Sequence, residues 1–218
     1  LQSELARAIA REIKIAVTPA EQARLALTRP VNPEAYQLVL RARSFWNKRT
    51  EQDLMRAKEL FENAIEADPT YALAHAGLAD TYNMLASYYF MPPADAYPKA
   101  QEAALTALEL DENLAEAYTS MAWVKYRYEG DWFGAETDYN WAIGLNPSYA
   151  IAHHWYGSLL RDMGRLDEAL TEMERARELN PFSLSINTSI GYLFYFGRQY
   201  DQSISQGQKA LQMDPDFH

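Results

Sequence analysis

Residues 146–181 read NPSYAIAHHWYGSLLRDMGRLDEALTEMERARELNP, and this stretch decides the fold. Small and apolar residues recur in it at intervals of three and four, the spacing that places side chains on one face of a helix: Tyr156 and Leu160, then Ala169, Met173 and Ala176. Gly164 lies between the two runs, and Pro181 cannot continue a helix interior. The stretch therefore predicts two short helices that form a hairpin.

The same pattern returns with a fixed period. Pro147, Pro181 and Pro215 are 34 residues apart, and each closes or opens a similar run of small, aromatic and apolar residues. Spacing and residue pattern together resemble the tetratricopeptide repeat, a helix-turn-helix unit of 34 residues. One such hairpin cannot bury both of its faces, so these units stack and need about three or more copies for stability. The resemblance implies an all-α, right-handed superhelix.

Five repeats are expected in residues 31–218, at about 32–70, 71–113, 114–148, 149–182 and 183–218, after an N-terminal helical segment at 1–30. The first three exceed the template, by about three residues near 44–52, nine near 86–98 and one near Gly130. We expect these insertions in loops, with the second folding back onto the array. Gly207 takes the position of Phe61 and Met173, so the last helix should lack one packing contact and fray.

Composition narrows the range of partners. The chain of 218 residues has a formal net charge of −10, which disfavours nucleic acid because phosphate neutralisation dominates that affinity. It has no cysteine, which excludes disulfides and thiolate metal sites. No apolar run reaches the length of a membrane span and no signal-peptide pattern opens the chain, so a cytoplasmic location is expected. Because Leu1 comes first, we expect a piece of a longer polypeptide.

A narrower resemblance covers most of the chain. Segments 5–26 (LARAIAREIKIAVTPAEQARLA), 32–50 (NPEAYQLVLRARSFWNKRT), 71–82 (YALAHAGLADTY) and 92–111 (PPADAYPKAQEAALTALELD) resemble the C-terminal region of large bacterial signalling proteins. In that group a winged-helix DNA-binding domain or a Ser/Thr kinase domain comes first, often followed by a TolB-like region. The resemblance implies that residues 1–17 are the last helix of the TolB-like region. Any kinase or DNA-binding activity would belong to sequence outside this chain.

Residues that carry out catalysis or hold cofactors are not apparent. Neither GxxxxGK nor GxGxxG is present, which argues against a nucleotide site. His153 and His154 are adjacent, so they point to different faces of a helix and cannot bind one metal ion together. We expect His153 in the core and His154 toward a groove. The expected protein is therefore not an enzyme and has no catalytic residue, cofactor or metal, and we do not favour an enzymatic site between residues 83–98 and the groove.

A binding groove is the main functional hypothesis. In solenoids that resemble this chain, the first helix of each hairpin lines a concave face, and the corresponding positions here are Arg43, Trp46, Asn47, Asp80, Asn83, Met84, Trp123, Tyr126, Arg127, His154, Ser158, Arg161, Tyr192, Tyr195 and Phe196. Aromatic residues and arginine are enriched at interface hot spots. Packing between neighbouring hairpins is the other explanation for the aromatic residues. A chaperone tail is not the expected ligand, because Val39, Ala76 and Thr119 occupy the positions of a carboxylate clamp.

The sequence thus predicts a protein-interaction or regulatory scaffold that binds a peptide or partner helix in the groove. If so, Trp123→Ala with Arg127→Ala should abolish partner capture without changing the melting temperature. The alternative is self-association through the open terminal repeat, where Phe217 and the N-terminal helix offer apolar faces.

Overall fold

The computed structural model describes residues 32–214, and within this range every regular element is helical. The elements are α3 (Pro33–Trp46), α4 (Glu51–Ala67), α5 (Ala72–Ser87), α6 (Pro93–Leu110), α7 (Ala115–Val124), the π-helical turn η1 (Lys125–Glu129), α8 (Trp132–Leu145), α9 (Ala150–Asp162), α10 (Leu166–Leu179), α11 (Leu184–Phe196) and α12 (Tyr200–Met213). The expected N-terminal helical segment at 1–30 and Phe217 lie outside the described residues.

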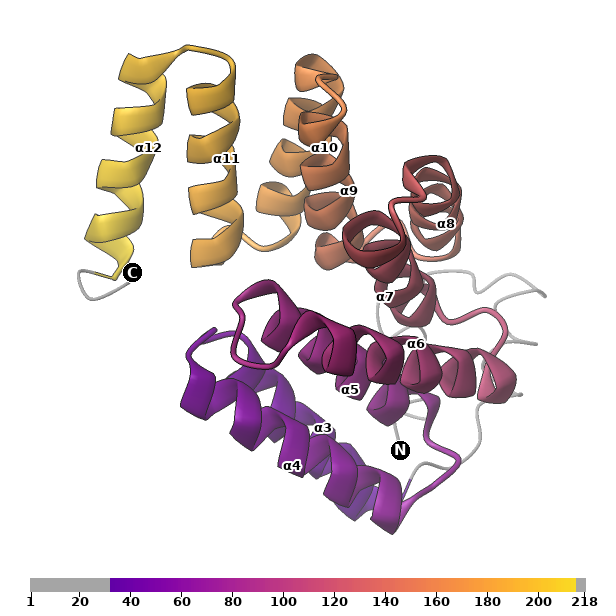
Figure 1. Cartoon of the computed structure of the whole chain (residues 1–218). Helices are drawn as coiled ribbons and strands as arrows, with labels where there is room; N and C mark the ends of the chain where they lie inside the picture. Colours follow the sequence, from indigo (N-terminus) through magenta and orange to yellow (C-terminus); the bar gives the residue numbers. More distant parts are fainter. Residues whose placement is uncertain (1–31, 215–218) are drawn as a thin grey trace, which may run out of the picture.

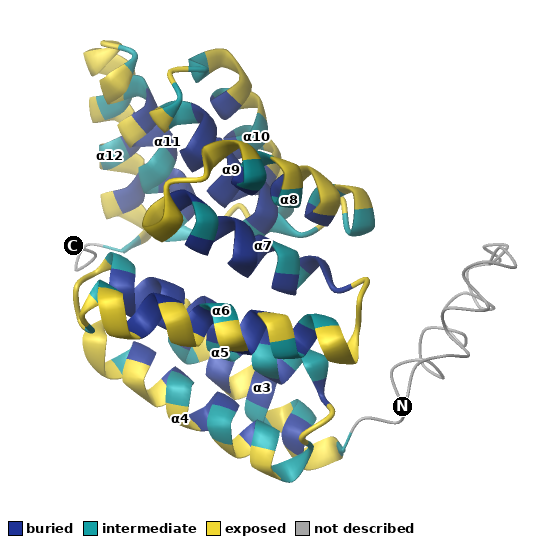
Figure 2. Cartoon of the chain, turned by 45° about the vertical axis from the view of Figure 1, so that its right-hand side comes forward, coloured by how far each residue is buried: buried dark blue, intermediate teal, exposed yellow. Residues whose placement is uncertain are grey.

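Successive helices pair as hairpins, and the hairpins follow one another along a curved array (Figure 1). The pairs are α3/α4, α5/α6, α7/α8, α9/α10 and α11/α12. The predicted all-α superhelix of about five hairpins is therefore confirmed. Buried residues lie on the helix faces that meet inside the array, and exposed residues cover the outer faces of α4 and α8 (Figure 2).

Close approach of the two helices explains the small residues of the quoted stretch. In the α9/α10 hairpin, a Cβ atom on Gly157 would lie 2.7 Å from Cγ of Met173 and 3.1 Å from the carbonyl oxygen of Ala169. Both Ala169 and Met173 are fully buried. A larger residue at position 157 would push the helices apart, because a packed core tolerates added atoms poorly.

Each of the five hairpin turns contains one residue in the left-handed backbone region: Arg49, Tyr89, Gly130, Gly164 and Arg198. Glycine adopts this conformation without steric cost, whereas other residues pay about 1–3 kcal/mol. Arg49 and Arg198 have almost the same φ, 62° and 58°, at equivalent turns. They differ in environment, since Arg49 is buried and Arg198 is exposed.

The expectation that inserted residues form loops is wrong for the first two repeats. Helices α5 and α6 have 16 and 18 residues, against 13 and 14 in α9 and α10, so only residues 88–92 connect them. Likewise α4 has 17 residues and starts one turn earlier relative to its buried face. Helix extension pairs the added backbone groups internally, which a long loop cannot do.

The single extra residue of the third repeat also lies in a helix. Residues 125–129 form the π-helical turn η1, which ends at Gly130 with φ 73° and is closed by the amide of Asp131 donating to the carbonyl of Lys125 at 3.0 Å. A π turn takes in one more residue than an α turn, so the helix absorbs the insertion.

The last hairpin, α11/α12, lacks one packing contact, as its sequence predicts. A Cβ atom placed on Gly207 would have no neighbouring atom within 4 Å, which confirms that the contact made by Phe61 and Met173 at this position is missing. Large apolar side chains are exposed on both helices of this hairpin: Tyr192, Tyr195, Phe196, Tyr200, Ile204 and Leu211. The α11/α12 hairpin therefore presents broad apolar surface.

Candidate functional site

A pocket of about 700 Å³ lies on the face formed by the first helices of the hairpins, and we call it the concave pocket. Its lining comes from all five hairpins and comprises the aromatic residues Tyr88, Trp123, Tyr126, Trp155 and Tyr192, the basic or imidazole residues Arg49, Arg127, Arg161 and His154, the hydroxyl residues Ser87, Ser158, Ser185, Thr188 and Ser189, and the small or apolar residues Met84, Gly207, Ala210 and Leu211. It combines aromatic walls with positive charge.

Part of the predicted groove is filled by the chain itself. Trp46, Asp80 and Asn83 are 1%, 0% and 0% exposed, so the expectation that they face a bound partner is wrong. Trp46 is covered by Trp155 of α9 in the fourth hairpin, whereas Asp80 and Asn83 bond to Arg43 and Ser120 of the adjacent hairpins. The rings of Trp46 and Trp155 lie 6.2 Å apart between centroids.

Asp80 is the centre of a polar network that joins four successive hairpins. Its carboxylate accepts a hydrogen bond from Nη1 of Arg43 at 2.6 Å and one from the hydroxyl of Ser120. The hydroxyl of Tyr149 lies 3.5 Å away. Asp80 thus contributes to the packing of the first four hairpins.

The other residues of the first two hairpins that the sequence predicts in the groove lie at different sites. Arg43 and Asn47 line a second pocket of about 430 Å³, together with Glu116 and Tyr149. The side-chain amide of Asn83 donates to the carbonyl of Ser120 at 3.1 Å, between neighbouring hairpins. From this half of the chain, the concave pocket is lined by Met84 and Ser87 of α5 and by Arg49 and Tyr88 of the connecting turns.

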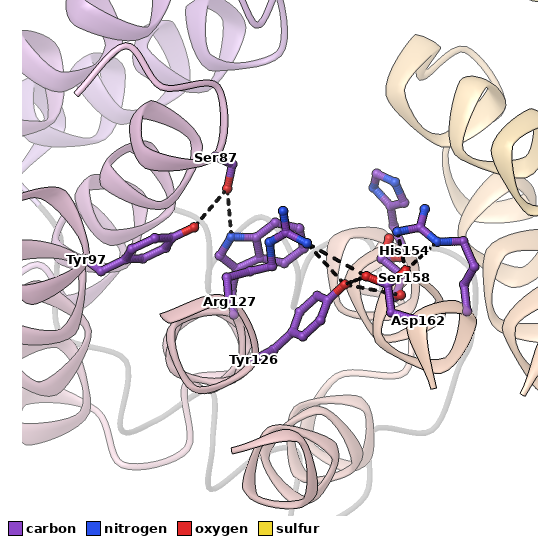
Figure 3. A network of polar contacts seen from close by, with 9 residues as sticks. Ser87, Tyr97, Tyr126, Arg127, His154, Ser158 and Asp162 are labelled. Carbon is purple, nitrogen blue, oxygen red and sulfur yellow. Dashed lines mark hydrogen bonds and ion pairs between the residues drawn. The ribbon is translucent and has the colours of Figure 1, made fainter. Parts of the chain in front are cut away.

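Trp123 lines the pocket but is also part of the core. Its indole Nε1 donates to Oγ of Ser87 at 3.1 Å, and Tyr97 meets the same hydroxyl at 3.3 Å (Figure 3). The ring packs on Trp155 with centroids 4.5 Å apart. Because Trp123 is 8% exposed and packs in the core, we now expect Trp123→Ala with Arg127→Ala to lower the melting temperature instead of leaving it unchanged.

Tyr126 and Arg127, which lie in the π turn, face Asp162 of α9 (Figure 3). The hydroxyl of Tyr126 donates to Asp162, and Nη1 of Arg127 lies 3.8 Å from the same carboxylate. Arg161 donates to Asp162 at 2.8 Å through Nε. Burial, followed by the hydrogen bond to Asp162, raises the pKa of Tyr126 to about 12, so the phenol stays neutral. The two arginines are thus held at the pocket wall by one shared carboxylate.

His154 lines the same pocket from α9, and its Nε2 and the hydroxyl of Ser189 on α11 are 2.8 Å apart. Burial, assisted by the positive charges of Arg49 and Arg161, lowers the pKa of His154 to about 3. The imidazole is therefore neutral at physiological pH. It offers the pocket a hydrogen-bonding group without adding charge.

The shifted pKa of His154 makes stability depend on pH. The unfolded chain takes up this proton at the ordinary value of 6.5 and the folded chain only near 3, so the unfolded state holds more protons between these values. Stability must therefore fall as the pH is lowered, by on the order of 2 kcal/mol from pH 7 to pH 5 for this group alone. Urea unfolding of His154→Gln, which keeps a partner for Ser189, should show a correspondingly smaller loss than the wild-type chain. Equal losses in the two chains would contradict the assignment.

Other predicted residues fall outside the concave pocket. Tyr195 and Phe196 are exposed on α11 and do not line it, although the Phe196 ring lies 5.3 Å from the guanidinium of Arg161. His153 packs in the core as predicted, with its ring nitrogens 2.6 Å from Glu172 and 3.1 Å from the carbonyl of Pro147. Among residues 32–214, no group of three or more His, Asp or Glu side chains is placed to hold a metal ion.

Several pocket residues were missed by sequence reasoning. Arg49 lies in the first hairpin turn at the place of Gly130 and Gly164, and because Tyr89 and Arg198 also occupy this place in other turns, the sequence gives no signal that singles out Arg49. Trp155 and Ser189 do not occupy the positions that were mapped to the groove. Trp155 lines the pocket beside Trp123, and Ser189 lines it beside His154.

Within the described range, no helix combines the length and apolar character that crossing a membrane requires.

Comparison with known proteins places this geometry in a family. A tetratricopeptide-repeat family model matches residues 125–183 and 157–217. The transcriptional regulator HilA of Salmonella typhimurium is 23% identical over 176 residues, which is 81% of this chain and 32% of HilA. A putative adenylate cyclase 3 of Rhizobium meliloti is 32% identical over 79 residues, covering 36% of this chain and 14% of the cyclase. The chain thus spans about a third, or less, of the length of these relatives.

Solved structures show the same fold. A thermophilic tetratricopeptide-repeat protein of Thermus thermophilus superposes with a TM-score of 0.64 at 19% identity, over 84% of this chain and 92% of its own. The human IFIT1 dimer with m7Gppp-AAAA gives a TM-score of 0.62 at 20% identity, over 76% of this chain and 40% of its own. The 34-residue period, the stacked hairpins and the matching family model together show that the chain belongs to the tetratricopeptide-repeat proteins.

Proposed function

We propose that this chain is a non-catalytic interaction module that binds a short peptide segment in the concave pocket. Tetratricopeptide repeats are interaction scaffolds, which supports a binding role in general. The observation that carries the specific proposal is that the concave pocket contains both solvent-accessible arginine and aromatic side chains and buried aromatic side chains. Of the residues that line this pocket, Tyr192 is 61% exposed and Arg127 is also accessible, whereas Trp155 is buried.

The lining suits an extended peptide. The aromatic rings offer apolar surface, which contributes about 25 cal/mol per Å² buried before the costs of association. Ser158, Ser185 and Thr188 add hydroxyl groups that pair with the polar backbone of a peptide. Positive charge at the rim favours acidic side chains in the partner.

The wider context is a second part of the proposal. The partial match to HilA, a transcriptional regulator, supports placement of the repeats at residues 31–218 within a larger cytoplasmic bacterial regulator. The repeats then sense or recruit a partner while another domain acts. RNA, which accompanies IFIT1 in its structure, is a poorer ligand for a chain with a net charge of −10.

Selection from a random-peptide phage library, followed by affinity measurement with the best binder, tests this proposal. We expect Tyr192→Ala and Arg127→Ala each to weaken binding by about 10- to 100-fold, as loss of hot-spot side chains does. Trp141→Ala and Arg175→Ala are matched controls, because Trp141 is 57% exposed on α8 and Arg175 is exposed on α10, both away from the pocket. The controls should bind as the wild-type chain does.

Equal effects of pocket and control variants would contradict the proposed site. A library that yields no binder competing at the pocket would count against peptide binding altogether.

The exposed apolar surface of the α11/α12 hairpin favours self-association as the alternative. Phe196, Tyr200 and Ile204 are all more than half exposed there, and a second copy would bury them. Sedimentation equilibrium distinguishes the two functions. A dimer that Ile204→Glu dissociates would support self-association, and a monomer at high concentration would remove it.

A further inference from the structure

Arg49 is a buried charge whose position the fold does not explain. It follows α3 in the first hairpin turn, is 9% exposed and lines the concave pocket. Its Nε and Nη1 atoms are buried and have no hydrogen-bond partner. Buried polar groups in proteins are paired in the great majority of cases, and an unpaired guanidinium is among the costliest exceptions.

The backbone at Arg49 adds a second cost. Its φ of 62° lies in the left-handed region, where glycine serves at Gly130 and Gly164 in equivalent turns. Arg198 has the same conformation, but its side chain is exposed to water. Position 49 therefore combines strain with desolvation, a combination that stability alone does not favour.

The side chain is nevertheless held in one orientation. Its guanidinium stacks on the ring of Trp46, with 3.3 Å between Cζ and the ring centroid. Burial lowers the pKa of Arg49 to about 10, so the group remains charged at neutral pH. The planar, charged guanidinium of Arg49 is thus fixed in the pocket wall, and its Nε and Nη1 donors have no partner.

No carboxylate is hydrogen-bonded to the buried nitrogens of Arg49, although the negative charge of Asp80 acts on the guanidinium at longer range. The pocket lining includes three arginines and neither an aspartate nor a glutamate. Arg127 and Arg161 share the carboxylate of Asp162, which lies beside the pocket. Arg49 alone among the three has buried nitrogens without a partner. An anion that enters the pocket would supply the partner that these nitrogens lack.

We propose that Arg49 forms a carboxylate-binding subsite of the concave pocket, which takes the acidic side chain of a bound peptide. This inference rests on the proposed function and names the chemistry of its ligand. Guanidinium groups pair side-on with carboxylates through two parallel hydrogen bonds from Nε and Nη2, as Arg165 does with Glu168 at 2.8 and 2.7 Å. Nε of Arg49 has no partner, so a carboxylate that reaches this side of the guanidinium would satisfy it. The positive pocket in an acidic chain gives the charge complementarity that selects such a peptide.

The free chain provides the first test. Arg49→Met removes a buried unpaired charge and keeps the length of the side chain, so we expect the melting temperature to rise by roughly 2–4 °C. Arg198→Met, at the same backbone conformation but exposed, should leave it unchanged. A lower melting temperature for Arg49→Met would mean that Arg49 has a structural role and would overturn the proposal.

The second test is a double-mutant cycle of binding affinities. It compares the wild-type chain and Arg49→Met, each with the phage-selected peptide and with the same peptide whose acidic residue is changed to the amide. The acidic peptide should bind the wild-type chain about 10- to 100-fold more tightly than Arg49→Met. The amide peptide should bind both chains equally. Selected peptides without an acidic residue, or a cycle without coupling, would overturn the subsite while leaving peptide binding in place.

A third measurement is independent of any peptide. At matched ionic strength, glutarate should raise the melting temperature of the wild-type chain more than chloride or inorganic phosphate does. For Arg49→Met, glutarate should raise the melting temperature no more than chloride or phosphate. Failure of glutarate, or a larger effect of phosphate, would overturn the assignment of a carboxylate. If no library peptide binds the pocket, the proposed function fails, and the glutarate result still decides whether the anion subsite exists.

Discussion

Replacing Asp80 by alanine is expected to lower the free energy of unfolding by about 3–5 kcal/mol. The carboxylate is completely buried and lies 2.6 Å from Nη1 of Arg43, whose side chain is largely buried as well. Removal of Asp80 leaves that guanidinium without its partner, and it also frees the hydroxyl of Ser120. Because the contacts come from three other hairpins, the loss should also make the N-terminal half of the array unfold separately in urea.

The matched control is Glu178→Ala, which breaks an exposed pair with Arg175 on α10. Exposed pairs contribute about 0–1 kcal/mol, so this variant should unfold almost as the wild-type chain does. If Asp80→Ala kept its stability but lost peptide binding, Asp80 would belong to the groove, as its sequence position predicted. That result would contradict the network described here.

Trp155→Ala is expected to cost about 3–5 kcal/mol, the range for a large side chain removed from a core. Trp155 packs on Trp123 with ring centroids 4.5 Å apart and on Trp46 at 6.2 Å, so it joins the first, third and fourth hairpins. Its removal would leave a cavity under the concave pocket. Urea unfolding followed by circular dichroism measures the loss.

The chain offers a control of the same residue type. Trp141 is 57% exposed on α8, where it meets only the edge of Tyr118 at 6.3 Å between centroids. Trp141→Ala should change stability by less than about 1 kcal/mol. Similar losses for Trp141→Ala and Trp155→Ala would show that the aromatic cluster does not hold the array together.

The fold was predictable because its signal is local and repeated. The spacing of Pro147, Pro181 and Pro215 and the small residue Gly157 describe one hairpin and its period, and each hairpin contacts mainly its neighbours. The insertions were placed wrongly for the same reason. Whether extra residues lengthen a helix or a loop depends on capping and tertiary contact, and the π turn at residues 125–129 has no simple sequence signal.

The site could be predicted from the sequence only for residues whose exposure does not depend on contacts between different hairpins. Position mapping assigned Trp123, Tyr126, Arg127, His154, Ser158, Arg161 and Tyr192 to a groove, and the structure brings these residues to one pocket, without showing that a partner binds there. It also assigned Trp46 and Asp80, which the structure buries. The burial of Asp80 follows from its bonds to Arg43 and Ser120 on the adjacent hairpins, and that of Trp46 from its contact with Trp155, three repeats further along the chain. Contacts between repeats so far apart are set by the summed rotation of several hairpins, which no single repeat encodes.

The most direct test of the central claim uses the five tryptophans as reporters of where a peptide binds. Trp123 and Trp155 line the concave pocket, whereas Trp132 and Trp141 lie on α8 outside it. Indole N–H resonances, assigned through single Trp→Phe variants, are followed by NMR while the phage-selected peptide is added. Shifts of Trp123 and Trp155 with Trp132 and Trp141 unchanged are the predicted result. Shifts confined to Trp132 and Trp141 would place the partner on the outer face and contradict the account.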